Sequence, residues 1–442
     1  KISELTALTS PDGAEELVVN DSGTTKKITI DNLFNQDIDV SGKVTADGLV
    51  TNTAGTSNFV AGVNAGNSIV SGGNYNTLVG DEAGTAITTG IANVVLGNNS
   101  LSSNTTGGYN VVAGQAAMRD NTTGANNSAF GHNALKSNTT ASNNTAVGMS
   151  ALLANTTGTQ NVAVGSSSLI TNTTGGQNTA VGLNSLLLNT TGSYNSTLGI
   201  QALNSNTTAS NNVAMGYQSL YANTTGTQNV AVGSSSLITN TTGSYNTALG
   251  RTSLLANTIG THNSAMGRSA LQNNTTGSYN TGLGMDAGGS TTTGNYNVSV
   301  GFNATATSST AGNQCTLGDA NITNLRCNDG SISSLSDSRD KTDVIDSPYG
   351  LDFINTVRPV QYLWDTRDGN VKDGTTRIGF LAQELLAATN GNNAVLDLVL
   401  DDNPDKLEAK YGNLLPIMVQ AIQELSTQNA ALAARLTTLE EG

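Results

Sequence analysis

The residues of this chain that could do chemistry lie together in one short stretch. Hydroxyl, carboxylate, guanidinium and ammonium groups fall close together there, at Ser336, Asp337, Arg339, Asp340 and Lys341. A nearly uncharged repeat array precedes this stretch, and a mixed, charged segment follows it. A serine hydroxyl beside the peptide bond that it attacks needs no substrate binding, only a base and a correctly oriented, strained peptide. We therefore interpret the junction as a self-cleavage site.

The spacing Ser-Asp-x-Arg-x-Lys at residues 336–341 resembles the start of the peptidase S74 family. This family is the intramolecular chaperone domain at the C-terminus of phage tail fibres, tailspikes and endosialidases. Later pieces fit the same family, in the same order: Arg358-Pro359-Val360-Gln361-Tyr362, Ile378-Gly379-Phe380-Leu381-Ala382-Gln383-Glu384 and Tyr411-Gly412-Asn413-Leu414-Leu415-Pro416. The resemblance covers residues 336–442, and the order of the pieces is its specific feature.

This resemblance implies a single-turnover autoproteolysis by a serine–lysine dyad, with no turnover activity in the repeat array. Ser336 is then the nucleophile, Lys341 is its partner, and the cut falls between Leu335 and Ser336. A lysine must be neutral to act as a base, whereas an ordinary lysine in water has a pKa of about 10.4. Burial favours the neutral form. We therefore expect assembly to desolvate Lys341, so that only a finished assembly is cut into residues 1–335 and 336–442.

The roles of the two residues between them stay open at this point. Arg339 either orients the reacting groups or forms a plain salt bridge, and the same two interpretations apply to Asp337. The whole motif can also be a helix or turn cap without chemistry, because Ser-Asp pairs are common in turns.

Composition indicates a fibrous or solenoid protein. The 442 residues include 50 glycines, and only 11% are charged and 4% aromatic, which does not describe ordinary globular cores. The net charge is -14, and no basic face is present to release phosphate counterions, so nucleic-acid binding is disfavoured. The apolar runs are too short for a transmembrane helix or a signal peptide. Because Lys1 is not an initiator Met, we expect a fragment or a processed form.

Outside the junction, no residue pattern predicts a catalytic, cofactor or metal site. His132 and His262 have no cysteine or carboxylate cluster near them in sequence, so we expect surface or packing histidines. Cys315 and Cys327 lack the partners of a metal site and are expected to be free, buried thiols. The glycines of the array set turns, because no Gly-Lys-Ser/Thr follows them. No cofactor is therefore expected.

A repeat of 17 residues dominates the chain from Gly80 onward. Its period is visible in a series of glycines: Gly80, Gly97, Gly114, Gly131, Gly148, Gly165, Gly182, Gly199, Gly216, Gly233, Gly250, Gly267, Gly284, Gly301 and Gly318. Around Gly165, for example, Asn161 lies four residues before, Val164 one before and Leu169 four after, and an Asn-Thr-Thr-Gly turn follows. Such periodicity predicts a stacked β-solenoid with ladders of identical residues, each repeat giving two short strands and two turns. The pattern is similar to the head repeats of trimeric adhesins and to phage-fibre β-rolls or interwound β-helices.

We expect a parallel homotrimer. One repeat buries too little apolar surface to offset the cost of ordering its residues, so stacking and contacts between subunits must supply the rest. Small residues two before the glycines would permit close approach of neighbouring chains: Ala163, Ala180, Ala214, Ala231 and Ala248. A heptad at about 412–440 predicts a coiled coil. Its a positions are Leu415, Ile422, Asn429 and Leu436, and its d positions are Met418, Leu425, Leu432 and Leu439. Asn429 would fix the register.

Four segments follow from these patterns. Residues 1–57 are a β attachment or stem segment with a hairpin about Asp21-Ser22-Gly23, residues 58–318 are the solenoid shaft, residues 319–335 are the neck and cleavage junction, and residues 336–442 are the S74-like chaperone. The chaperone is expected to be an α+β domain, and residues 379–388 are expected to form the first part of a helix. Its expected core residues are Phe353, Val357, Val360, Tyr362, Trp364, Ile378, Phe380 and Leu381.

The leading functional hypothesis is a trimeric phage tail fibre or receptor-binding protein, assembled in the host cytoplasm and carried on the virion. Its N-terminus would join the tail, baseplate or another fibre subunit, and the array would touch a surface glycan, without membrane insertion. Tyrosines one before the Asn of their repeats could stack on sugars or form a packed ladder: Tyr109, Tyr194, Tyr245, Tyr279 and Tyr296. One alternative is a bacterial trimeric adhesin. Another is an ice-binding solenoid with hydroxyl ladders at Thr156-Thr157 and the equivalent pairs.

Overall fold

The computed structural model describes residues 16–21, 24–29, 53–322, 324–326, 336–365 and 374–441. The chain divides into two units, Lys1–Thr51 and Asn52–Gly442. In the first unit, β1 (Glu16–Asp21) pairs antiparallel with β2 (Thr24–Thr29), so the predicted hairpin is confirmed. Residues 30–52 of the predicted attachment or stem segment lie outside the described residues.

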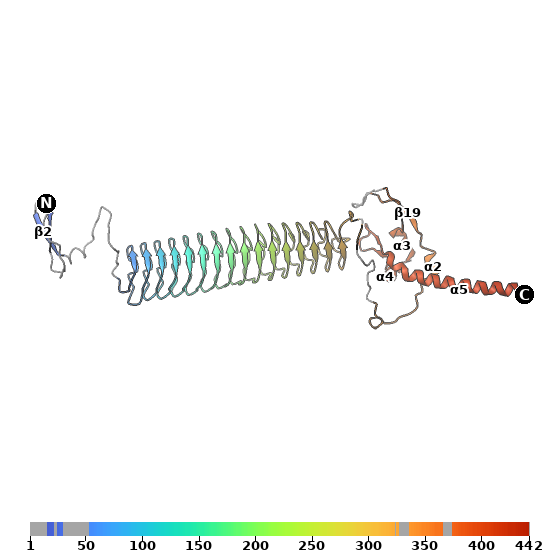
Figure 1. Cartoon of the computed structure of the whole chain (residues 1–442), viewed down its shortest axis with the longest axis horizontal. Coiled ribbons are helices and arrows are strands. Elements are labelled where there is room, and N and C mark those ends of the chain that lie inside the picture. The colour runs from blue at the N-terminus through green and yellow to red at the C-terminus, as the bar shows by residue number, and fades with distance from the viewer. Residues whose placement is uncertain are drawn as a thin grey trace. The chain divides into compact units, whose positions relative to one another are not determined.

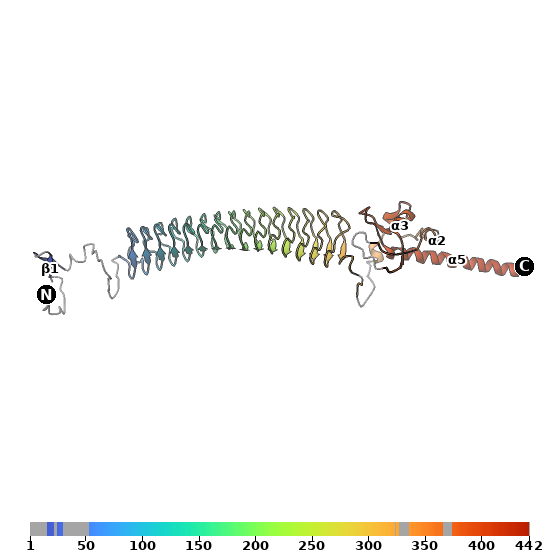
Figure 2. The same cartoon turned by 90° about the horizontal axis from the view of Figure 1, so that it is seen from above.

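A long β-solenoid begins the second unit, which confirms the predicted fold class. Each coil contributes one short strand, and each strand pairs in parallel with the equivalent strand of the next coil of the same chain. Figure 1 shows these coils as a stack, and Figure 2 shows the strands gathered along one side of it. The strands form one sheet: β3 (Phe59–Ala61), β4 (Thr77–Val79), β5 (Val94–Leu96), β6 (Val111–Ala113), β7 (Ser128–Phe130), β8 (Thr145–Val147), β9 (Val162–Val164), β10 (Thr179–Val181), β11 (Ser196–Leu198), β12 (Val213–Met215), β13 (Val230–Val232), β14 (Thr247–Leu249), β15 (Ser264–Met266), β16 (Thr281–Leu283), β17 (Val298–Val300) and β18 (Cys315–Leu317).

The prediction of two strands per coil is wrong, because the second segment is a turn. In the coil of β9, Ser167 and Leu169 have positive φ angles of 55° and 51°, in the left-handed region. Each such residue costs about 1–2 kcal/mol relative to the right-handed conformation. Leu169 is fully buried, so its burial offsets a cost of that size. Two left-handed residues so close together break the extended conformation that a strand needs.

The core lies inside the coils of the single chain. Ala163 and Leu169, with their equivalents along the array, have no exposed surface. The expectation that Ala163, Ala180, Ala214, Ala231 and Ala248 let neighbouring chains approach is therefore wrong, since these side chains point into their own coil. Strand residues alternate between faces, so the large residue beside each alanine points outward. Met215, for example, lies beside Ala214 and is 40% exposed.

Two ladders of buried asparagines hold the coils in register. The backbone N–H of Asn178 donates to Asn161 Oδ1 at 3.0 Å, and its side-chain amide donates to the carbonyl of Gly192 at 2.9 Å. In the second ladder, the Asn172 amide donates to Asn155 Oδ1 at 2.8 Å. Because buried amides are costly unless they are hydrogen-bonded, every coil needs its neighbour at this one offset.

The repeated glycine is required by both conformation and space. Gly165 has a φ of 133°, and a Cβ on it would meet the carbonyl oxygen of Gly182 at 2.5 Å. We expect Gly165→Ala to destabilise the solenoid by about 1–3 kcal/mol or more, the range for a strained backbone residue, and to lower its melting temperature in circular dichroism. The neighbouring Ser166→Ala is the control. Equal melting temperatures for the two variants would contradict this role of the glycine.

A small α+β domain with a long C-terminal helix ends the chain (Figure 1). Its elements are η1 (Ser338–Asp340), α2 (Leu351–Ile354), β19 (Val360–Tyr362), β20 (Arg377–Gly379), α3 (Ala382–Ala388), α4 (Asn393–Leu396), β21 (Val399–Leu400), β22 (Glu408–Ala409), η3 (Tyr411–Asn413) and α5 (Leu414–Glu440). Strands β19 and β20 pair antiparallel, as do β21 and β22.

The core of this domain differs in part from the expected one. Its buried residues are Phe353, Leu385, Leu396, Leu398, Val399, Leu414 and Ile417, with Val357 and Phe380 packed against them. Of the other expected core residues, Ile378 is 81% exposed, and Trp364 and Leu381 are also exposed. The expected helix at 379–388 also begins only at Ala382, because residues 377–379 form strand β20.

Helix α5 has two apolar faces with different surroundings. Leu414, Ile417 and Ala421 are buried on the small domain. The side chains at the predicted a and d positions are all exposed in the single chain: Leu415, Met418, Ile422, Leu425, Asn429, Leu432, Leu436 and Leu439. Glu424 ties the helix to α2, because it accepts a hydrogen bond from the backbone N–H of Leu351 at 2.8 Å, which lowers the pKa of the Glu424 carboxyl. In the part of the chain that the structure describes, no helix is long and apolar enough to cross a membrane.

Candidate self-cleavage site

The stretch that carries the predicted dyad contains a single 3₁₀ turn, η1. Asp337 caps η1, since its side chain accepts a hydrogen bond from the backbone N–H of Arg339 at 2.9 Å. At the other end, the backbone N–H of Lys341 donates to the carbonyl of Ser338 at 3.3 Å. This turn reverses the chain between Ser336 and Lys341. The turn cap, which the sequence offered as an alternative interpretation of this motif, is thus present.

The same turn brings the predicted nucleophile and its predicted partner into contact. Lys341 Nζ donates to Ser336 Oγ at 2.6 Å, a hydrogen-bonding distance over which a proton can move in either direction. A neutral amine in this position would accept the hydroxyl proton instead of donating its own. The cap and the serine–lysine contact therefore exist together in one turn.

Asp337 and Arg339 form an ion pair with each other. Arg339 Nε lies 3.0 Å from Asp337 Oδ1, and Nη2 lies 2.5 Å from Oδ2. The guanidinium lowers the pKa of Asp337, and the carboxylate raises the pKa of Arg339. The pair is therefore intact above the ordinary pKa of an aspartate and is lost as the pH falls through the lowered value. Neither residue touches the dyad through its side chain, which makes the salt-bridge interpretation the one that the geometry favours.

All the side chains of this turn are exposed in the single chain. Residues 336–341 carry no buried side chain, and Leu335, which holds the carbonyl to be attacked, lies outside the described residues. The geometry of the dyad is thus preformed, but water surrounds Lys341. A base at this position requires a further surface that removes the water.

The later pieces of the predicted motif meet in space. Arg358 Nε donates to Glu384 Oε2 at 3.0 Å, which joins the piece at 358–362 to the piece at 378–384. This pairing lowers the pKa of Glu384. The backbone N–H of Phe380 donates to Tyr411 Oη at 3.3 Å, and the two rings pack edge to face. Three segments that are distant in sequence therefore build one part of the domain.

A stacked aromatic ladder was only partly foreseen. Tyr245, His262, Tyr279 and Tyr296 stack in consecutive coils with ring centroids 4.7, 4.7 and 4.9 Å apart. The packed-ladder interpretation is confirmed for this stretch, and both ring faces of His262 and Tyr279 are covered, which prevents them from stacking on a sugar. His262 was expected to be a surface or packing histidine, but its place in this ladder was not predicted, although it lies 17 residues after Tyr245. This spacing, equal to the repeat length, would have placed His262 in the ladder.

The remaining candidate residues show no catalytic arrangement. Cys315 is a free thiol but exposed, so the expectation of a buried thiol is wrong for it, and Cys327 lies outside the described residues. Among described residues, no group of His, Cys, Asp and Glu has the arrangement of a metal site. In the threonine pairs, the Thr156 hydroxyl donates to the carbonyl of Thr173, so one hydroxyl of each pair is used inside the array.

The comparisons with known proteins agree with the C-terminal motif. Residues 336–396 match the family model of peptidase S74, described as the chaperone of endosialidase. No curated protein and no solved structure is significantly similar to the chain. A chaperone segment of this family, placed directly after a long β-solenoid, fits a trimeric fibre-type protein.

Proposed function

We propose that the chain is a trimeric phage tail fibre or receptor-binding protein whose C-terminal chaperone directs assembly and is then released by autoproteolysis. The observation that carries this proposal is the position of the Ser336–Lys341 contact. The dyad lies at the first residue that matches the chaperone family, and directly after the segment that follows the solenoid.

The cleavage chemistry follows from that contact. Ser336 Oγ attacks the carbonyl carbon of Leu335 while Lys341 takes the hydroxyl proton. The C–N bond then breaks, the proton passes to the leaving amine of Ser336, and an ester joins residue 335 to the Ser336 oxygen. One water hydrolyses this ester, which gives a carboxylate at residue 335 and a free N-terminus at Ser336. These steps account for every atom and proton without a cofactor.

Two exposed apolar surfaces support a trimer. The outward face of the solenoid sheet carries exposed large side chains on many strands: Val94, Leu96, Val111, Phe130, Val147, Leu198, Met215, Met266, Leu283, Val298 and Leu317. Exposed apolar patches of this extent mark interaction sites. The a and d side chains of α5 form a second such surface, with the spacing of a parallel coiled coil. Two further copies of the chain would cover both.

A repeat fibre needs a chaperone for a physical reason. Equivalent coils are alike, so three solenoids could associate one or more coils out of register at little cost, as weakly specified strands do. A unique trimerising domain at one end removes these slipped states. This argument explains why a domain needed only during assembly would later be cut away.

Attachment to a host and placement on the virion belong to the same proposal. The N-terminal unit would join the phage tail, its baseplate or another fibre subunit. The array carries few charges, so it would bind a cell-surface glycan through hydroxyl and amide hydrogen bonds. Tyr109 and Tyr194 are exposed and lie in coils whose neighbours lack an aromatic at this position, which leaves their ring faces available for a sugar.

Light scattering tests the assembly that the proposal requires. We expect the uncut Ser336→Ala chain to have a native mass of about three times 44.9 kDa, because both apolar surfaces need partners. Asn429→Ile should keep the helices associated but give mixed stoichiometries, since a polar a residue specifies register and oligomeric state. A monomeric Ser336→Ala chain under native conditions would remove the basis for the fibre.

A further inference from the structure

The last coil of the solenoid departs from the repeat. The asparagine ladder that includes Asn280 and Asn297 ends in Gln314, which is longer by one methylene. The backbone N–H of Gln314 still donates to Asn297 Oδ1 at 3.1 Å, as the ladder requires. Its side chain does not continue the ladder but turns to Thr307, whose backbone N–H donates to Gln314 Oε1 at 2.9 Å.

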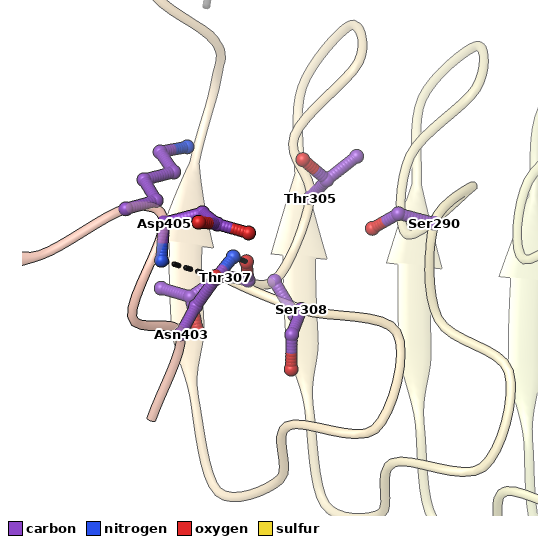
Figure 3. Close-up of a pocket in the computed structure, with 8 residues that line it drawn as sticks. Ser290, Thr305, Thr307, Ser308, Asn403 and Asp405 are labelled. Carbon is purple, nitrogen blue, oxygen red and sulfur yellow. Dashed lines mark hydrogen bonds between the residues drawn. The ribbon is translucent and has the colours of Figure 1, made fainter. Parts of the chain in front are cut away.

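A loop of the C-terminal domain meets this altered coil. Asp402 Oδ2 accepts hydrogen bonds from the Gln314 side-chain amide at 2.8 Å and from the Thr307 hydroxyl at 2.7 Å. Asn403 donates from its side-chain amide to the carbonyl of Thr307 at 2.7 Å. Figure 3 shows Asn403 reaching Thr307 at the edge of a small polar pocket. The pocket is lined by Ser290, Thr305, Ala306, Thr307, Ser308, Asn403, Asp405 and Lys406.

We propose that residues 402–406 are a docking loop through which the C-terminal domain binds the last coil of the solenoid. Asp402 satisfies the Gln314 amide and the Thr307 hydroxyl. Elsewhere in the array the next coil satisfies the equivalent groups, as for the Asn178 amide and the Thr171 hydroxyl. The loop therefore takes the place of a missing coil and caps the open end of the solenoid.

The docking loop gives the chaperone a second link to the shaft, besides the peptide bond. Resting on the proposed function, we infer that this link retains residues 336–442 on the solenoid after the cut at residue 335. The Asp402 contacts are exposed, the Asn403 contact is part-buried, and each is weak by itself. A trimer, however, holds three docking loops on one coiled coil. Linked weak contacts act together and lengthen the lifetime of the complex. Release is thus governed by the docking loop and not by the cut alone.

An engineered cut tests this inference without the chemistry of Ser336. In the Ser336→Ala chain, a recognition site for a sequence-specific protease replaces residues 329–334, and the trimer is digested. The half-time for dissociation of the C-terminal fragment is then measured by gel filtration. We expect Asp402→Ala to shorten this half-time at least tenfold, because it removes a charged acceptor of two hydrogen bonds. Asp352→Asn, which removes a charge from an exposed position on α2, should leave it unchanged.

A double-mutant cycle identifies the partners. Gln314→Ala should shorten the half-time as well, and Gln314→Ala combined with Asp402→Ala should be little worse than Asp402→Ala alone. Thr307→Val serves as a second, nearly isosteric variant if Gln314→Ala disturbs the last coil, which the native mass before digestion reports. Immediate dissociation of the parent, an unchanged half-time for Asp402→Ala, or fully additive effects would overturn the inference. If the fragment stays bound but the natural chain never cuts itself, the docking loop stands and the autoproteolytic proposal fails.

Discussion

Replacing Ser336 with alanine is expected to stop self-cleavage altogether and to leave full-length trimers. The substitution removes the oxygen that lies 2.6 Å from Lys341 Nζ, and no other hydroxyl in the turn makes this contact with the lysine. Loss of a nucleophile that acts as a unit with its base costs orders of magnitude, about 10⁶-fold in a well-studied serine protease. Denaturing electrophoresis and intact mass of the assembled protein measure the result.

The matched control is Ser338→Ala, which removes a hydroxyl from the same 3₁₀ turn and keeps the backbone carbonyl that accepts a hydrogen bond from the Lys341 N–H. It should cut like the parent. Lys341→Ala should slow cleavage by about 10²–10⁴-fold, the usual contribution of a general base. Cleavage of the Ser336→Ala chain at residue 335 would show that another group is the nucleophile.

Breaking the coiled coil is expected to abolish both trimerisation and cleavage. Ile422→Asp with Leu425→Asp places two carboxylates per chain at consecutive a and d positions, and burying unpaired charges in a helical seam is prohibitive. In the single chain the Ile422 and Leu425 side chains are 65% and 46% exposed, and neither belongs to the buried core of the domain. Without the trimer, Lys341 stays exposed to water, and the surface that would desolvate it is missing.

Ala434→Asp is the matched control, since Ala434 lies on α5 at the heptad position farthest from the seam. This variant should remain trimeric and cut itself. If the doubly substituted chain is monomeric yet cuts at the parental rate, assembly is not the switch, and the preformed Ser336–Lys341 contact suffices by itself.

The sequence predicted the solenoid well because a strict period transfers directly into structure. Once Gly165 and Gly182 are equivalent, stacking places every pair of equivalent residues in adjacent coils, which is why the asparagine ladders and the tyrosine stripe could be foreseen. The sequence did not show which side chains of each strand point into the coil and which point outward. Ala163 and Val164 are both apolar, and only the curvature of the coil decides that the small one points inward.

The sequence also did not predict the backbone conformation of single residues. A leucine at position 169 favours a strand by its apolar side chain, yet the structure holds it in the left-handed region, where the gain from burial exceeds the local cost. At the junction, spacing alone placed Ser336 and Lys341 near each other, but it did not show that the Asp337 cap and the serine–lysine contact occur in the same turn. The hydrogen bond between Gln314 and Asp402 joins residues that are far apart in sequence. No repeat or other sequence pattern predicted it.

Intact mass of the parent chain, measured over time on the isolated trimer, tests the central claim most directly. The account predicts that the 44.9 kDa chain is replaced by two fragments, residues 1–335 and 336–442, with Ser336 as the new N-terminus and one water gained in the summed mass. A trimer that keeps its single full-length chain after prolonged incubation would contradict it.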